Sequence, residues 1–230
     1  MSCKIAAMIG LSAMFVGSAA SADTVDMKFV GVGKAQVVSV SGVYNGNVYA
    51  GQLNHQFSNG NGEGAALSGI LPTFCTEITQ LVTSSTKTYT LIGVPNGPRP
   101  GAGMGAVKAQ AIYNLYAATS GDQNSSNDKA AAFQTMIWEL VYDYDGSAGS
   151  ISFNSGNVRF GMSSAIQTIF NSLKTLVTSS SPASANGLRI ATNDFAQDQL
   201  VQVPNQVPLP GAAGLGIAGM GLMAARRRRA

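Results

Sequence analysis

Hydrophobic and polar residues alternate along residues 26–58, a pattern that is typical of β-strands with one buried face. Asn45-Gly46 divides this stretch into two runs, and both residues tolerate the positive φ angles of a tight turn. The sequence therefore predicts a β-hairpin here. Further apolar runs predict strands at Leu71–Val82, Lys87–Val94, 188–191 and 199–203, and glycine- and proline-rich segments predict loops at 59–69 and 95–105.

The spacing of apolar residues changes to that of helices after residue 103. One helix is expected from Met104 to Gly121 and another over 166–177. Between them, a helix capped by Asp128 carries apolar residues at i, i+3, i+4, i+7, i+8 and i+11 from Phe133 to Tyr144 and ends at Asp145-Gly146. Because helices interrupt a series of strands, we expect an α+β fold: a strand-rich sandwich or barrel-like body with a helical insertion of two to three helices.

Residues 1–22 have the organisation of a secretory signal peptide. Lys4 gives a positive start, an apolar stretch follows from Ile5 to Gly17, and Ala20-Ser21-Ala22 offers the small residues that signal peptidase accepts. We therefore expect cleavage before Asp23, with signal peptidase as a partner during export. Residues 23–206 have the length of a single extracytoplasmic domain.

The C-terminal residues 207–230 combine a proline-containing motif, a short apolar run and an arginine cluster, in that order. A stable bilayer span needs roughly 20 apolar residues, so the run at 211–225 is marginal, and the arginines favour the cytoplasmic side. This order resembles the PEP-CTERM sorting signal in its VPLPA-type variant, which implies recognition by an exosortase at the membrane. An ordinary weak C-terminal anchor is the alternative. The residues that carry the resemblance are Val207, Pro208, Leu209, Pro210, Arg226, Arg227, Arg228 and Arg229.

The formal charge of +3 comes from the two ends of the chain. Without Lys4 and the C-terminal arginines, 9 of the 14 basic residues remain against 11 acidic ones. Residues 23–206 therefore carry a charge of about −2 and no basic patch, so we expect no nucleic acid among the partners. His55 is the single histidine, and we expect neither a zinc site nor a cofactor.

Cys75 is the single cysteine of residues 23–206, so no disulfide can form within that domain. Such a thiol is a small buried apolar group, a partner for another chain, or a reactive group. Two local patterns stand out: Phe74-Cys75 on a predicted strand, and Phe133-Gln134 with Ile137-Trp138 on the second predicted helix. Gln134 is expected at the half-sheltered edge of the apolar stripe, where it can face the strand that carries Cys75.

These two patterns resemble the thioester domains of bacterial surface adhesins. The resemblance implies that the Cys75 thiolate attacks the side-chain amide of Gln134 and releases ammonia, which leaves an internal thioester that a partner's amine or hydroxyl can open. It also implies that Trp138 shields this bond from water. Glu77, expected on the same strand face as Cys75, and Glu139 are the candidates to take up the thiol proton.

The sequence therefore predicts an exported, exosortase-sorted protein of the cell surface or extracellular matrix, transiently held in the membrane by its C-terminus. The resemblance to thioester domains implies covalent attachment to a matrix polysaccharide or a surface protein, and we do not expect the protein to be an enzyme. One alternative is a non-covalent matrix or saccharide-binding module with an inert Cys75. Another is a secreted hydrolase, with either Cys75 and His55 or a pair of Asp/Glu residues as its catalytic groups.

Overall fold

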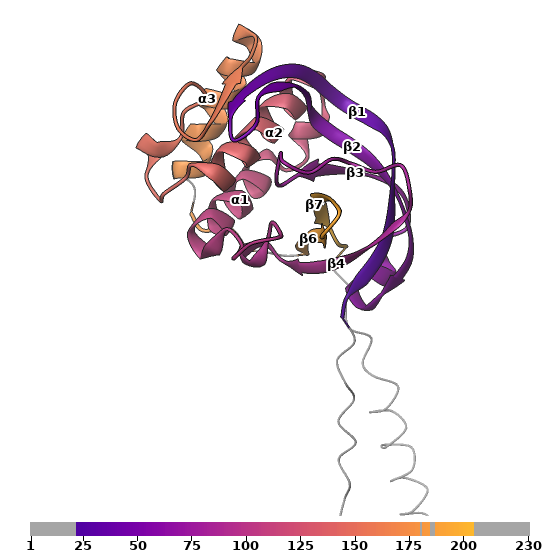
Figure 1. The fold of residues 1–230 in the computed structure, drawn as a ribbon. Helices are drawn as coiled ribbons and strands as arrows, with labels where there is room; N and C mark the ends of the chain where they lie inside the picture. Colours follow the sequence, from indigo (N-terminus) through magenta and orange to yellow (C-terminus); the bar gives the residue numbers. More distant parts are fainter. Residues whose placement is uncertain (1–21, 180, 185–186, 205–230) are drawn as a thin grey trace, which may run out of the picture.

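Figure 1 shows a computed structural model of the chain, which describes residues 22–179, 181–184 and 187–204. The expected signal peptide, apart from Ala22, and the expected sorting signal at 207–230 lie outside these residues. In the described part, seven strands and three α-helices form an α+β fold, as the sequence predicts. None of the helices in this part is long and apolar enough to cross a membrane.

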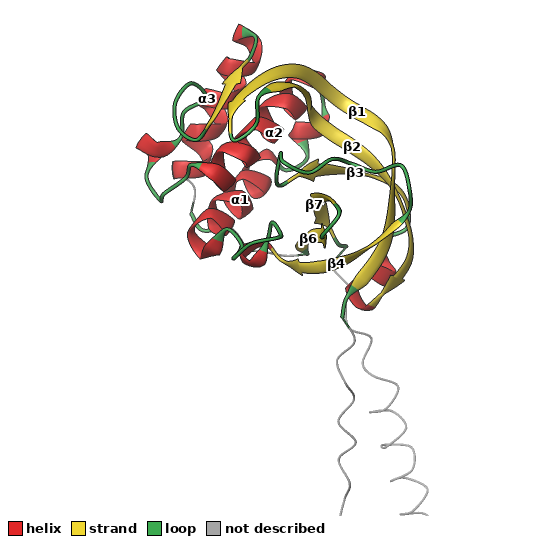
Figure 2. Cartoon of the chain, viewed as in Figure 1, coloured by secondary structure: helices red, strands yellow, loops and turns green. Residues whose placement is uncertain are grey.

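Six of the strands form a closed, barrel-like ring (Figure 2). They pair in the order β1-β2-β3-β7-β6-β4, and β4 pairs with β1 to close the ring; every pairing is antiparallel. A short additional strand, β5, pairs with the end of β1 and was not predicted. The strands are β1 (Thr24–Gly42), β2 (Gly46–Asn61), β3 (Gly69–Cys75), β4 (Lys87–Gly93), β5 (Val158–Gly161), β6 (Leu188–Asn193) and β7 (Ala196–Gln202).

The predicted hairpin is present as β1 and β2, but its turn is longer than a two-residue Asn45-Gly46 turn. Val40 pairs with Gly46, which leaves residues 41–45 without a partner in the hairpin; Ser41 and Gly42 still belong to β1 and pair with β5. The side chain of Asn45 accepts a hydrogen bond from the amide of Gly42 at 3.3 Å. Asn45 therefore stabilises the loop through its side chain, and the prediction of a tight turn at this position was wrong.

Both strands of the hairpin bend around the ring. The register of β1 against β2 shifts between Phe29 and Gly31 and again between Val32 and Ala35, and such bulges increase the local bend of a strand. Gly51 (φ 142°) lies inside this bend on β2. A Cβ atom at this position would be 2.3 Å from the carbonyl oxygen of Lys34, so the close approach of the two strands requires glycine here.

Three helices pack on one side of the ring: α1 (Gly105–Thr119), α2 (Asn127–Tyr142) and α3 (Ser164–Ser179) (Figure 1). The central helix α2 contacts α3 as well as β1 and β2. All residues from Ala130 to Val141 are buried, so this part of α2 has no solvent-facing side, whereas the sequence predicted a single apolar stripe. The helix also ends at Tyr142, earlier than predicted.

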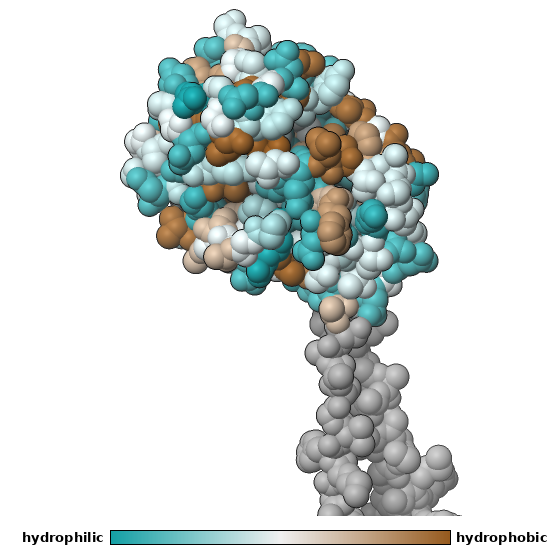
Figure 3. Space-filling model, in the orientation of Figure 1, coloured by the Kyte–Doolittle hydropathy of each residue, from teal (hydrophilic) through white to brown (hydrophobic). Residues whose placement is uncertain are grey.

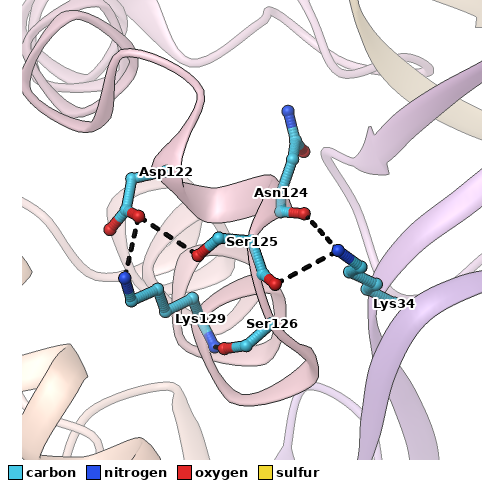
Figure 4. A network of polar contacts seen from close by, with 6 residues as sticks. All are labelled: Lys34, Asp122, Asn124, Ser125, Ser126 and Lys129. Carbon is cyan, nitrogen blue, oxygen red and sulfur yellow. Dashed lines mark hydrogen bonds and ion pairs between the residues drawn. The ribbon is translucent and has the colours of Figure 1, made fainter.

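The linker before α2 is fixed to the hairpin by polar contacts (Figure 4). Lys34 Nζ of β1 donates to the carbonyl oxygens of Asn124 (2.7 Å) and Ser125 (3.1 Å). Ser126, not Asp128, is the N-cap of α2, and its hydroxyl accepts from the amide of Lys129 at 3.2 Å. Asp128 instead accepts from the side chain of Gln36 on β1 at 2.7 Å. These contacts hold the first turn of α2 against the ring.

Candidate functional site

Cys75 is the last residue of β3, whereas the sequence predicted a strand that continues to Val82. Just after it, the side chain of Glu77 bonds to the residues that follow: its Oε2 accepts from the amides of Thr79 (2.7 Å) and Gln80 (2.8 Å). These bonds form a tight turn in place of the strand. The prediction that Glu77 lies on the strand face of Cys75 was therefore wrong.

Gln134 of α2 meets Cys75, as the sequence predicts, but it contacts the backbone of this residue. The amide nitrogen of Cys75 donates to Gln134 Oε1, and Gln134 Nε2 donates to the carbonyl oxygen of Cys75, both at 2.8 Å. The Gln134 side chain is fully buried rather than half-sheltered, because α2 has no exposed side. Both polar atoms of its amide are thus bonded to the main chain of Cys75.

The thiol of Cys75 lies against two glutamines of β7. Cys75 Sγ donates to Gln197 Oε1 at 2.9 Å, while Gln197 Nε2 donates to the carbonyl oxygen of Glu77 at 3.0 Å. Gln199 pairs with Cys75 in the sheet, and its Nε2 lies 3.3 Å from Gln197 Oε1 and 4.0 Å from Cys75 Sγ. Neither glutamine was predicted as a site residue from the sequence. The sequence feature that could have found them is the alternation of Gln197 and Gln199 in a closing strand, because alternate residues of a strand lie on the same face of the sheet.

A chain of side-chain contacts continues from Gln199 to His55. Thr73 Oγ1 donates to Gln199 Oε1 at 2.8 Å and lies 2.9 Å from His55 Nδ1. Burial lowers the pKa of His55 to about 4, so its imidazole is neutral at pH 7. Among the described residues, no hydrogen bond joins His55 directly to Cys75, which gives no support to a Cys-His hydrolase pair.

The surroundings keep the thiol protonated. Burial raises the pKa of Cys75 well above that of an ordinary thiol, and the negative charge of Glu77 raises it further. A reaction at Cys75 therefore starts from the neutral thiol, and the proton has to leave the sulfur during the attack. This differs from the thiolate that the resemblance to thioester domains implies.

Glu139 does not approach the thiol. It follows Gln134 by five positions on α2, which places it about 140° around the helix. Its Oε1 accepts from the amide of Ser152 at 2.7 Å, on the other side of α2. Burial raises the pKa of Glu139 to about 8, so this carboxyl is largely protonated at neutral pH. The structure gives Glu139 no role as acceptor of the Cys75 proton.

A cavity of about 430 Å³ has Cys75, Gln197 and Trp138 in its wall. Trp138 is 1% exposed and stacks on Phe160 with ring centroids 6.0 Å apart. The rest of the wall is mostly aromatic and aliphatic, and its outer part includes Tyr49 and Leu81, which are 60% and 79% exposed. Figure 3 shows that apolar side chains also reach the surface in several places on the face in view. The cavity thus extends from exposed residues to Cys75 along an apolar wall.

Within residues 22–179, 181–184 and 187–204, no group of three or more His, Cys, Asp or Glu side chains could hold a metal ion. Comparisons of the chain with protein-family models, with curated proteins and with solved structures found no match. The contacts around Cys75 and the residue patterns at the two ends of the chain are therefore the features that bear on function.

Proposed function

We propose that this protein is exported to the cell surface or extracellular matrix and attaches covalently to a partner through an internal thioester between Cys75 and Gln197. The main support is the 2.9 Å contact between Cys75 Sγ and Gln197 Oε1 in a buried site. Gln197 replaces Gln134 as the proposed acyl donor, because the Gln197 amide contacts the thiol itself, whereas the Gln134 amide is bonded to the Cys75 backbone.

The proposed reaction needs no cofactor. Cys75 Sγ attacks the amide carbon of Gln197, the thiol proton passes to the amide nitrogen, the carbon–nitrogen bond breaks, and ammonia leaves. The bonds from Gln134 hold the backbone of Cys75 on both sides of its Cα, so that the sulfur stays beside Gln197. Such positioning favours an intramolecular reaction of two neutral groups.

The cavity beside Cys75 and Gln197 offers a route for the partner. An amine or hydroxyl of a surface protein or matrix polysaccharide attacks the thioester carbon, forms an amide or an ester with residue 197, and returns the Cys75 thiol. Trp138 closes the inner wall of the cavity and limits the access of water.

A second candidate function is a non-covalent binding module with an inert Cys75. The observation that favours it is the buried, protonated thiol, which is 4% exposed and whose pKa is raised. In that case the apolar cavity is itself the ligand site and Cys75 is a part of its wall.

Intact mass spectrometry of residues 23–206 separates the two candidates. With a thioester, the protein is lighter by one ammonia and Cys75 resists alkylation in denaturant until methylamine is added. Gln197→Met and Cys75→Ser should both abolish the mass loss. A full mass in the wild type, together with complete alkylation of Cys75 in denaturant, would leave only the non-covalent candidate.

The proposed export has a separate test. In cells that lack the exosortase, we expect the protein to accumulate at the membrane with residues 207–230 still attached. Equal cleavage of residues 207–230 with and without the exosortase would show that another enzyme, or no enzyme, recognises this segment.

A further inference from the structure

Gln199 lies beside both reacting groups of the proposed thioester. It is fully buried and pairs with Cys75 between β7 and β3. Its amide oxygen accepts a hydrogen bond from Thr73 Oγ1 at 2.8 Å. Its amide nitrogen therefore faces the opposite way, 3.2 Å from the main-chain oxygen of Gln197, 3.3 Å from Gln197 Oε1 and 4.0 Å from Cys75 Sγ.

The amide oxygen of Gln197 gains negative charge when the Cys75 sulfur attacks the adjoining carbon. Before the attack this oxygen accepts from two donors, Cys75 Sγ and Gln199 Nε2. The thiol proton leaves with ammonia, so the sulfur can no longer donate a hydrogen bond to this oxygen. Gln199 Nε2 remains as a donor. The same oxygen becomes negative again when a nucleophile adds to the thioester, and a fixed donor lowers both barriers.

We propose that Gln199 is a catalytic residue, which stabilises the oxyanion at residue 197 during both the formation and the opening of the thioester. Thr73 is a positioning residue, since its hydroxyl holds the Gln199 amide with the nitrogen toward Gln197. This assignment rests on the proposed function. It involves no further reactant, because Gln199 donates a hydrogen bond and is unchanged at the end of each step.

Four variants test the assignment. Gln199→Met removes the donor at similar volume, Thr73→Val removes the hydroxyl that holds Gln199, and Thr73→Ser restores it. Gln52→Met is the matched control: Gln52 is also buried, at 7% exposure, but its amide contacts the amide of Lys34 (3.0 Å) and the side chain of Asn124 (2.6 Å).

Two rates are measured for each variant. The first is the rate of ammonia loss after refolding from denaturant, followed by intact mass. The second is the rate at which methylamine opens a thioester that has already formed, followed by the mass of the adduct. Circular dichroism on the same samples gives the folded fraction, by which both rates are normalised.

Removing one oxyanion donor slows a reaction by about 10²–10³-fold, so Gln199→Met should slow both rates by this factor. Thr73→Val should slow both by a smaller factor, while Thr73→Ser and Gln52→Met should keep the wild-type rates. A purely structural role of Thr73 would change the folded fraction and leave the normalised opening rate unchanged.

The outcomes distinguish this inference from the proposed function. If the wild type loses no ammonia, both fail. If the wild type forms the thioester and folded Gln199→Met forms and opens it at wild-type rates, the assignment of Gln199 is overturned and the proposed function stands. If Gln199→Met does not fold, the Thr73 variants decide, and equal normalised rates in Thr73→Val and Thr73→Ser overturn the assignment.

Discussion

Replacing Gln134 by methionine should destabilise the fold, because both backbone polar groups of Cys75 would lose their partner. The two hydrogen bonds are 2.8 Å long and lie in a fully buried site. A buried polar group left without a partner costs about 1–3 kcal/mol, so two such groups predict a loss of about 2–6 kcal/mol in the free energy of unfolding. Methionine has nearly the volume of glutamine, so only a small packing change is added.

The assay is urea denaturation in a Cys75→Ser background, so that a thioester does not contribute to the result. Thr135→Val is the matched control, because Thr135 is the next residue on α2 and is also fully buried. Its hydroxyl donates only to the helix carbonyls of Ala131 and Ala132, both at 3.0 Å. This control should lose about 0.5–1.5 kcal/mol. Equal unfolding free energies in Gln134→Met and Thr135→Val would refute the reasoning.

Three further variants test other contacts. Burial raises the pKa of Glu139 from 4.5 to about 8, so the folded state binds more protons than the unfolded state between these values and stability falls as pH rises through this window. Glu139→Gln keeps an acceptor for the Ser152 amide and should make this fall shallower; identical slopes of Tm against pH would contradict it. Gly51→Ala should lower the unfolding free energy by about 1–3 kcal/mol, because a Cβ would be 2.3 Å from the Lys34 carbonyl oxygen; an unchanged urea midpoint would show that the strands can separate there. Lys34→Met should cost about 0.5–1.5 kcal/mol and speed amide hydrogen exchange around Asn124, whose carbonyl oxygen accepts from Lys34 Nζ; unchanged exchange would mean that the linker does not need this contact.

The elements with strong periodicity could be predicted from the sequence. The hairpin, the three helices and the closing strands are all present close to their expected positions. The short strand β5 (Val158–Gly161) was missed, because four residues are too few to show a period. The end of β3 at Cys75 was also missed. It depends on the Glu77 turn and on a bond from the Thr76 amide to the carbonyl oxygen of Asp198 at 3.1 Å, a contact between distant parts of the chain.

Half of the candidate site could be predicted from local sequence patterns, and the other half depends on contacts between distant parts of the chain. Cys75 and Gln134 stand in local patterns that a sequence displays directly, and the structure brings the two residues together. Gln197 and Gln199 reach the thiol only because β7 pairs with β3, in the register that sets Gln199 opposite Cys75. A single sequence predicts which segments are strands but does not specify which strands become neighbours.

Because of the positions of Cys75 and Gln197 along the chain, the proposed bond would also affect the stability of the domain. They are 122 residues apart in sequence but lie on neighbouring strands, so a covalent link between them would turn most of the domain into a macrocycle. A cross-link that closes a loop of this length removes denatured-state entropy worth about 5 kcal/mol. A partner that opens the ring would make the protein linear again, so the conjugated protein should melt at a lower temperature than the unreacted one.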